Sequence, residues 1–367
     1  MKLEPFQLER YFARHEFSAP YLLSCSDCES MSIDDLLAMT PHAREQFHSL
    51  WLGYTESSGS PELRQAIAGL YDQVTADHIL VHAGAEEAIF NFMNTVLEPG
   101  DDVIVHAPRY QSLGEVARSI GANVISWEAD PETDWSLDID FLKNRLTPKT
   151  RAVVINVPHN PTGFLPDPDF MIALSELSNK HGVVVFADEV YRGLEYDRND
   201  RLPAFADINA QAVSLGVMSK TYGLAGLRIG WIATRNQGLY AKMAAFKDYT
   251  TICNSAPSEF LATLALEHHA SIAARNISII QANLKQLQAF FDGYTDLFHW
   301  QAPKAGPIAF PQYLGGNVAD FCRDLVEKAG VLLVPGSHFG HDGDCFRIGF
   351  GRRNLPECLE RLDSYLG

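Results

Sequence analysis

A lysine and an arginine stand close together in residues 219–231, which read SKTYGLAGLRIGW. Lys220 directly follows an apolar run typical of a buried strand, and a glycine-rich turn separates it from Arg228. In open α/β sheets, residues at strand ends face the crevice where ligands bind. A lysine there can act as a nucleophile towards a carbonyl group, and an arginine can bind an anion. We therefore interpret Lys220 and Arg228 as candidates for covalent catalysis and anion binding.

Two further strand ends carry an acid and an amide. In VVVFADEVY (183–191), Asp188 ends an apolar run and Tyr191 follows it. Burying an uncompensated carboxylate is costly, so Asp188 must be solvated, paired or functional. In VVINVPHNPTG (153–163), Asn160 follows another apolar run, although Asn-Pro-Thr-Gly is also compatible with an ordinary turn.

Residues 82–90, HAGAEEAIF, combine a strand end, a small turn and a helix start. Free backbone N–H groups at a helix start bind anions, so residues 84–86 are candidates for an anion site. The segment lacks the Walker lysine and the G-x-G-x-x-G pattern, which argues against nucleoside triphosphatase and dinucleotide sites. Together, the four strand ends offer an anion cradle, an amide, a carboxylate and a lysine. Pyridoxal phosphate requires this set for its phosphate, phenolic oxygen, ring nitrogen and aldehyde.

The elements that must position these residues are short apolar runs alternating with amphipathic stretches. Several runs are apolar throughout, which is typical of parallel strands covered on both faces. The alternation predicts an α/β fold with a mostly parallel sheet of about seven strands. The expected strands are Ile79–His82, Val103–His106, Asn123–Trp127, Ala152–Val157, Val183–Ala187, Val213–Met218 and Ile229–Ala233, and the expected helices between them are Pro61–Tyr71, Glu86–Leu97, Ser112–Ile120 and Pro168–His181.

The pattern changes after residue 255. A long helical stretch, 255–291, precedes short strands within 304–313, 330–335 and 345–350 and helices over 318–329 and 355–366. We predict a large domain over residues 46–255, followed by a linking helix and a small α+β domain over 256–367. Residues 1–45 contain too little apolar material to fold alone, and we expect them to pack on the small domain.

Composition argues against several classes of function. The 367 residues include 29 Lys and Arg against 46 Asp and Glu, a net charge of −17 that disfavours nucleic-acid binding. No stretch approaches the ~20 apolar residues of a membrane span. The charged N-terminal stretch contains no signal-peptide core, so we predict a cytoplasmic protein. Cys25 and Cys28 have no second pair nearby to complete a zinc site, and we expect free thiols and no metal centre.

Seven motifs follow one another along the chain and resemble those of fold-type-I pyridoxal-phosphate enzymes, specifically the class I/II aminotransferase family. They read GYTESSGSPELR, GAEEA, APRY, HNPTG, ADEVY, SKTYGLAGLRIGW and FRIGF. The resemblance covers nearly the whole chain. It implies pyridoxal phosphate as the cofactor, the type I PLP-transferase fold, and a homodimer with both active sites at the subunit interface.

The resemblance also implies roles for residues of this sequence. Lys220 would form a Schiff base with the cofactor and later move a proton. Asp188 would pair with the ring nitrogen, and Asn160 and Tyr191 would bond the phenolic oxygen. Arg347 would bind the substrate α-carboxylate, with Asn160 beside it. The remaining cofactor contacts are expected from Gly84, Ala85, Glu86, Ser219, Arg228, the stacking ring of Tyr110, and Tyr54, which would reach the phosphate of the neighbouring subunit.

The reaction itself stays open at this point. Residues 24–30, SCSDCES, lack the glycine that many family members carry near the N-terminus, so their polar side chains could face the substrate. The leading hypothesis is an aminotransferase that moves an amino group from an α-amino acid to a 2-oxo acid. The alternative keeps the fold and cofactor but predicts elimination, decarboxylation, or cyclisation or oxidation of an amino acid, as in enzymes resembling capreomycidine synthase or a C–S lyase. A regulator without turnover is disfavoured, because the chain has no spare length for a DNA-binding module.

Overall fold

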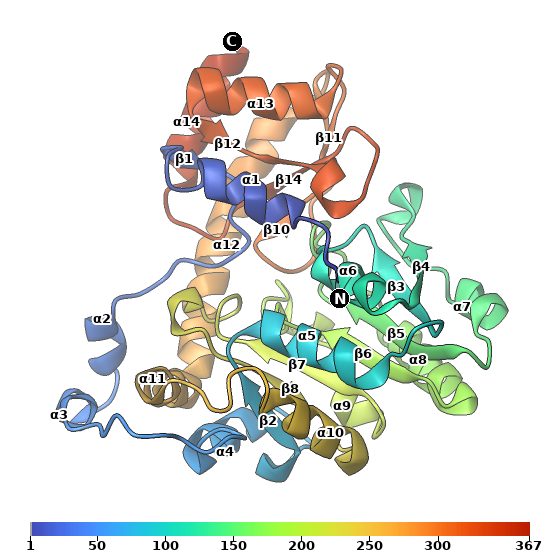
Figure 1. Ribbon diagram of the computed structural model, residues 1–367. Coiled ribbons are helices and arrows are strands. Elements are labelled where there is room, and N and C mark those ends of the chain that lie inside the picture. Colours follow the sequence, from blue (N-terminus) through green and yellow to red (C-terminus); the bar gives the residue numbers. More distant parts are fainter. Residues whose placement is uncertain (1) are drawn as a thin grey trace.

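The computed structural model describes residues 2–367 and contains a seven-stranded sheet (Figure 1). The strand order is β2-β8-β7-β6-β5-β3-β4, and neighbours are parallel except at β8, which is antiparallel to both β2 and β7. The strands are β2 (Ile79–His82), β3 (Asp102–Ala107), β4 (Asn123–Glu128), β5 (Thr150–Asn156), β6 (Val184–Asp188), β7 (Val213–Val217) and β8 (Gly230–Ala233). The predicted sheet of about seven mostly parallel strands is therefore confirmed.

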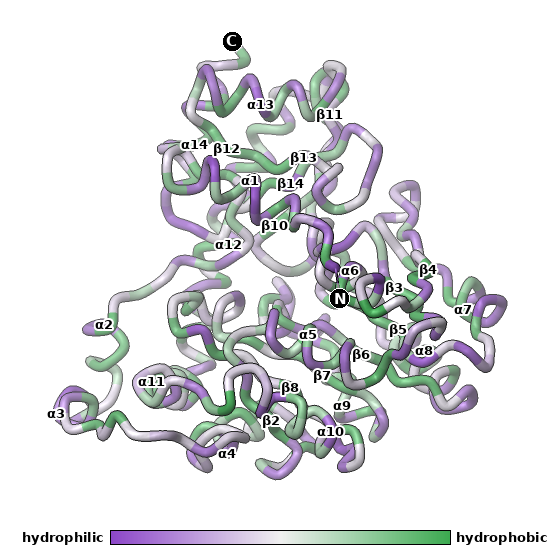
Figure 2. The backbone as a smooth tube through the Cα atoms, viewed as in Figure 1, coloured by the Kyte–Doolittle hydropathy of each residue, from purple (hydrophilic) through white to green (hydrophobic). Residues whose placement is uncertain are grey.

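Helices cover both faces of this sheet, and the strands are correspondingly apolar (Figure 2). Val154 of β5 packs in the cluster that contains Phe92, whereas its neighbours Val153 and Ile155 pack in the cluster that contains Leu174. Successive side chains of a strand point to opposite faces, so each face needs its own apolar cover. The covering helices are α5 (Ala85–Val96), α6 (Ser112–Ile120) and α10 (Gln237–Lys247) on one side, and α7 (Ile139–Arg145), α8 (Pro168–His181) and α9 (Phe205–Ile208) on the other.

Two helices occupy the region where the sequence predicts one over 255–291. Helices α11 (Ala256–Glu267) and α12 (His269–Asp292) meet at His268, whose φ of −107° and ψ of 16° interrupt the helical path. Helix α12 then carries the chain from the sheet to the C-terminal unit (Figure 1). Among residues 2–367, no helix has both the length and the apolar character needed to cross a membrane.

The C-terminal unit contains the antiparallel sheet β10-β14-β13, beside which helices α13 (Val318–Ala329) and α14 (Leu355–Leu366) pack. The predicted strand regions 304–313 and 330–335 are each divided into two short strands. The strands of this unit are β9 (Phe298–His299), β10 (Ile308–Ala309), β11 (Gln312–Tyr313), β12 (Val331–Leu332), β13 (Val334–Pro335) and β14 (Phe346–Gly349).

The N-terminal residues lie against both units. Helix α1 (Gln7–His15) buries Leu8 in a cluster with residues of the C-terminal unit, and β1 (Tyr21–Leu22) pairs with β12. Helices α2 (Ile33–Leu37), α3 (Ala43–His48) and α4 (Pro61–Ala68) instead share a cluster with α11. Within residues 33–45, Leu36 and Leu37 pack in the cluster that contains α11, and the packing of residues 1–45 on the small domain stays a prediction. The domain boundaries stay a prediction.

Candidate active site

A cavity of about 440 Å³ lies between the C-terminal edge of the parallel strands and the C-terminal unit. Because β8 is antiparallel, its first residues lie at this same edge, which brings Arg228 beside the ends of β2 and β7. The cavity brings together ten predicted site residues: Ala85, Glu86, Tyr110, Asn160, Asp188, Tyr191, Ser219, Lys220, Arg228 and Arg347. Gly84 lies directly beside Arg228.

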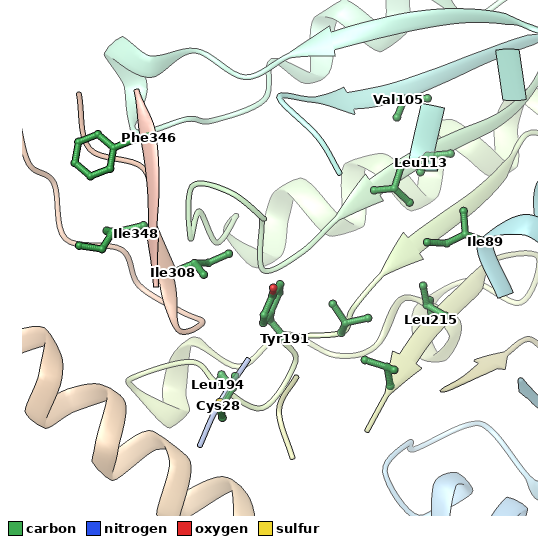
Figure 3. Close-up of a cluster of buried hydrophobic side chains, with 14 of the residues drawn as sticks. Cys28, Ile89, Val105, Leu113, Tyr191, Leu194, Leu215, Ile308, Phe346 and Ile348 are labelled. Atoms are coloured by element: carbon green, nitrogen blue, oxygen red, sulfur yellow. The ribbon is translucent and has the colours of Figure 1, made fainter. Parts of the chain in front are cut away.

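Lys220 contacts the N-terminal segment at the cavity wall. Its Nζ donates a hydrogen bond to Oγ of Ser26 at 2.8 Å and lies 6.0 Å from the ring centroid of Tyr191. The Tyr191 hydroxyl donates to the carbonyl oxygen of Ser26 at 3.0 Å. Figure 3 shows Tyr191 between Ile308 and Ile348 of the C-terminal unit and Leu215 of the central sheet. The segment around Ser26 therefore closes the cavity over the lysine.

Asp188 is the last residue of β6 and is buried. Burial raises the pKa of its carboxyl group to about 7, and one hydrogen bond from the Val190 N–H at 3.3 Å partly opposes this rise. Asn156 links the end of β6 to the segment that carries Asn160. Its side-chain N–H donates to the Asp188 carbonyl at 2.9 Å, and its side-chain oxygen accepts from the Asn160 N–H at 2.7 Å. Asn156 was missed from the sequence, although it is the polar residue that directly follows the apolar run AVVI (152–155).

The predicted anion cradle joins the start of α5 to Arg228. Gly84 precedes α5 with φ of 88°, and a Cβ atom there would stand 2.6 Å from Nη2 of Arg228. A side chain at position 84 would thus fill the space between the guanidinium and the free backbone N–H groups of α5. Glu86 lines the same cavity and accepts a hydrogen bond from the Ser112 hydroxyl at 3.1 Å. Burial raises the pKa of Glu86 to about 7, which favours its neutral form near an anion.

Arg347 lies on β14 and is 1% exposed. Nη1 donates to the side-chain oxygen of Asn160 at 3.1 Å, and Nη2 donates to the carbonyl of Ser24 at 2.8 Å. Its Nε has no hydrogen-bond partner within residues 2–367, and burial lowers the pKa of the guanidinium. A buried guanidinium with no carboxylate beside it is suited to binding an anionic ligand.

Glu9 and Arg352 line the cavity but were not assigned a cofactor or substrate contact from the sequence. Helix α1 contributes Glu9, whose carboxylate accepts from the Tyr110 hydroxyl at 3.1 Å. Arg352 donates to both carboxylate oxygens of Asp27, at 3.1 and 2.9 Å. No local motif marks these residues, because they reach the cavity only through long-range packing. Glu29, considered as a residue facing the substrate, instead accepts from the backbone N–H of Arg353.

Tyr54 lies outside this cavity. It is 87% exposed and lines a separate hollow with Leu52 and residues 253–257. Its expected contact with the phosphate of a neighbouring subunit stays a prediction.

The donor set fits pyridoxal phosphate. The anion cradle at Gly84 and Arg228 suits a phosphate, and the buried carboxyl of Asp188, with one backbone donor, suits a protonated ring nitrogen. The Lys220 amine lines the same cavity and can meet the aldehyde. When bound, the cofactor supplies an electron-withdrawing ring conjugated to the substrate nitrogen.

Solved structures with this fold bind the same cofactor. A PLP-dependent aminotransferase from Streptococcus suis is 32% identical, with a TM-score of 0.94 and coverage of 100% of this chain and 98% of that chain. The PLP-dependent cyclase OrfR is 30% identical, with a TM-score of 0.90 and the same two coverages. These neighbours confirm the predicted fold and the use of pyridoxal phosphate.

Relatives at the sequence level include two named enzymes. The capreomycidine synthase of Streptomyces vinaceus is 30% identical over 370 residues, which cover 100% of this chain and 93% of that protein. A probable N-succinyldiaminopimelate aminotransferase of Mycobacterium tuberculosis is 32% identical over 305 residues, 78% of this chain and 74% of that protein. The family described as aminotransferase class I and II matches residues 26–362. The chain therefore belongs to the class I and II aminotransferase family of pyridoxal-phosphate enzymes.

Proposed function

We propose that the protein is an aminotransferase that moves the amino group of an α-amino acid to a 2-oxo acid. The supporting observation is that one cavity holds the Lys220 amine, the Asp188 carboxyl and the Arg347 guanidinium. An amine can bind the cofactor aldehyde, a carboxylate can hold a proton on its ring nitrogen, and a guanidinium can bind a substrate carboxylate. Each of the three groups has a different task in the same reaction.

The surrounding residues orient these groups. In this proposal Asn160 and Tyr191 bind the phenolic oxygen, Tyr110 stacks on the ring, and Asn160 also positions Arg347 for the α-carboxylate. Ser219, Arg228 and the backbone of residues 84–86 bind the phosphate. Lys220 moves a proton between the substrate α-carbon and the cofactor. In the cofactor-free protein its hydrogen bond to Ser26 at 2.8 Å holds the amine at the cavity wall.

The proposal is tested by incubating the cofactor-loaded protein with single α-amino acids, with and without a 2-oxo acid. Product masses and the cofactor absorbance spectrum are recorded. Beyond one turnover per active site, we expect one amino acid to lose its amino group only as a 2-oxo acid gains it. Conversion that proceeds equally without a 2-oxo acid would contradict transamination.

A second candidate is cyclisation or another reaction of an amino acid on the same cofactor. Two relatives favour it, since capreomycidine synthase and the cyclase OrfR each match 100% of this chain. All of these reactions begin with the same lysine and cofactor, so the shared motifs do not separate them. In the experiment above, this candidate predicts a product that keeps its nitrogen atoms or releases ammonia without any 2-oxo acid.

The proposal includes a homodimer and a cytoplasmic location. Trp51, Leu52, Tyr54, Tyr249 and Ile252 are large apolar residues that stay exposed on the isolated chain. The hydroxyl of Thr55 donates to the carbonyl of Asn254 at 3.0 Å, which joins the two segments that carry them. Exposed aromatic groups of this kind are typical of protein–protein contacts. A second copy of the chain is the partner that the family implies.

A further inference from the structure

Helix α1 presents one face to the cavity. Leu8, Glu9 and Phe12 of this helix line it together with Glu16, the residue that follows the helix. Residues three or four positions apart share a face of a helix, so these four side chains form one row. At 1.5 Å per residue, Glu9 and Glu16 lie about 10 Å apart along the helix axis. The row therefore extends from Tyr110, which contacts Glu9, across the cavity.

Helix α1, Glu16, residues 26–27 and Arg352 form one wall of the cavity. Glu16 is the carboxylate of this wall that has no polar partner. Glu9 accepts from Tyr110, and Asp27 is paired through both oxygens with Arg352. The Glu16 side chain has neither a hydrogen bond nor an ion pair within residues 2–367, although it is only partly exposed. Burial raises the pKa of Glu16, and the positive charge of Arg352 opposes that rise. A cation placed beside Glu16 would compensate its loss of hydration.

The substrate side of the cavity faces Glu16. The guanidinium carbon of Arg347 lies 5.9 Å from the ring centroid of Phe12, and Glu16 follows Phe12 by one helical turn. Ser26, the partner of Lys220, is the neighbour of Asp27 in the chain. An amino acid bound through its carboxylate to Arg347 and its nitrogen near Lys220 thus has Glu16, Asp27 and Arg352 available to its side chain.

The charges of this wall determine which substrate side chains can bind beside it. Glu9, Glu16 and Asp27 contribute three carboxyl groups against the single guanidinium of Arg352. A substrate with a second carboxylate would meet like charge, whereas an ammonium or guanidinium group would meet an unpaired acceptor. Resting on the proposed function, we infer that the substrate is an α-amino acid with a cationic side chain, and that Glu16 binds that cation.

The test compares side chains of matched size and different charge. The cofactor-loaded protein is titrated with L-arginine and its neutral analogue L-citrulline, with L-lysine and L-norleucine, and with L-glutamate. Equilibrium dissociation constants are taken from the cofactor absorbance, and kcat/KM is measured in parallel. We expect each cationic amino acid to bind at least about tenfold more tightly than its neutral partner, and glutamate to bind least. The arginine and lysine arms distinguish a guanidinium ligand from an ammonium ligand.

The variant Glu16→Gln then tests whether Glu16 causes the preference for cationic side chains. It should reduce the ratio of affinities for arginine over citrulline, or for lysine over norleucine, by about tenfold. The affinity for the neutral amino acid and the resting cofactor spectrum should stay unchanged. Glu4→Gln, in the exposed residues before α1, is the matched control and should keep the wild-type ratio.

Three outcomes would overturn the inference. They are equal affinity for the cationic and neutral partners, preference for glutamate, or a ratio that survives in Glu16→Gln. The comparison of cationic with neutral amino acids on the wild-type protein tests the inference even if Glu16→Gln does not fold. A cofactor-loaded protein that binds cationic amino acids but never transfers their amino group would contradict only transamination. A protein that binds no amino acid would overturn both proposals.

Discussion

Lys220 is the residue on which the proposed chemistry depends most directly. The substitution Lys220→Ala removes the amine that would bind the cofactor aldehyde, so turnover should fall by at least about 10³-fold. The fold should persist, because the side chain makes one hydrogen bond, to Ser26, whose loss costs about 1 kcal/mol. Turnover, the visible spectrum and urea unfolding check these expectations. Lys242→Ala, at an exposed position of α10, should leave all three unchanged. Substantial turnover in Lys220→Ala would reject the assigned role.

The buried carboxyl group of Asp188 leads us to expect that the free energy of unfolding of the cofactor-free protein depends on pH. Burial raises its pKa from an ordinary 3.8 to about 7. Between those values the folded protein holds a proton that the unfolded chain has released, so the free energy of unfolding falls as pH rises through this window. Asp188→Asn removes this loss. The variant should gain on the order of 2 kcal/mol over wild type at pH 8, and less at pH 5. Urea unfolding at both pH values checks this expectation. An equal difference in the free energy of unfolding between variant and wild type at pH 5 and pH 8 would reject it.

Site residues differ in how far the sequence could identify them. Asp188, Asn160 and Lys220 follow apolar runs, so their meeting at one sheet edge follows from the predicted topology. Glu16 and Arg352 carry no such signal, because neither follows a strand of the central sheet. Their position depends on how the first 30 residues pack on β14, which a local pattern does not specify.

At the scale of elements, two glycines next to Arg347 determine where the N-terminal segment lies. The Gly349 N–H donates to the Leu23 carbonyl at 2.7 Å, and the Glu29 N–H donates to the Gly351 carbonyl at 2.8 Å. A Cβ atom at Gly349 would collide with the Cys25 carbonyl. The missing side chain thus lets residues 23–29 lie against β14 and form one wall of the cavity.

Gly349→Ala should therefore displace this wall. We expect a loss of about 2–4 kcal/mol in the free energy of unfolding and weaker binding of amino acids, because Ser26 and Asp27 leave their positions. Cofactor affinity should change less, since the phosphate cradle lies on the central sheet. Gly238→Ala in helix α10 is the control, and it should be neutral or slightly stabilising because only Asn236 lies near that position. Equal effects of the two substitutions would contradict this account.

Regular elements were the part of the fold that periodicity predicted best. All seven predicted strands of the central sheet are present, because most are short apolar runs between turn residues. The break at His268 was not predicted, since no proline or glycine marks it and apolar residues continue on both sides. The contact of Leu36 and Leu37 with α11 was also missed, because it joins residues more than 200 positions apart.

At the scale of the whole molecule, the exposed residues Trp51, Leu52 and Tyr54 predict a dimer. The protein should sediment at twice the mass of the chain. Leu52→Glu places a charge in that contact and should shift the protein towards the monomer. Cofactor affinity should fall in parallel, because Tyr54 would no longer reach the neighbouring phosphate site. Ile172→Glu, another exposed apolar position, on α8, should change neither property. A monomeric wild type with full activity would reject the shared site.

The pairing of β1 with β12 has a consequence for biosynthesis. Tyr21 and its partner Val331 are separated by about 310 residues, so Val331 is made well after Tyr21. At roughly 5–20 residues per second, the first strand waits about 15–60 s for its partner. Strand β6, which ends at Asp188, and strand β7, which precedes Lys220, are complete well before that time. A nascent chain thus finishes its cofactor-binding edge first, and the segment proposed to recognise the amino acid is fixed in place only after β12 has been made.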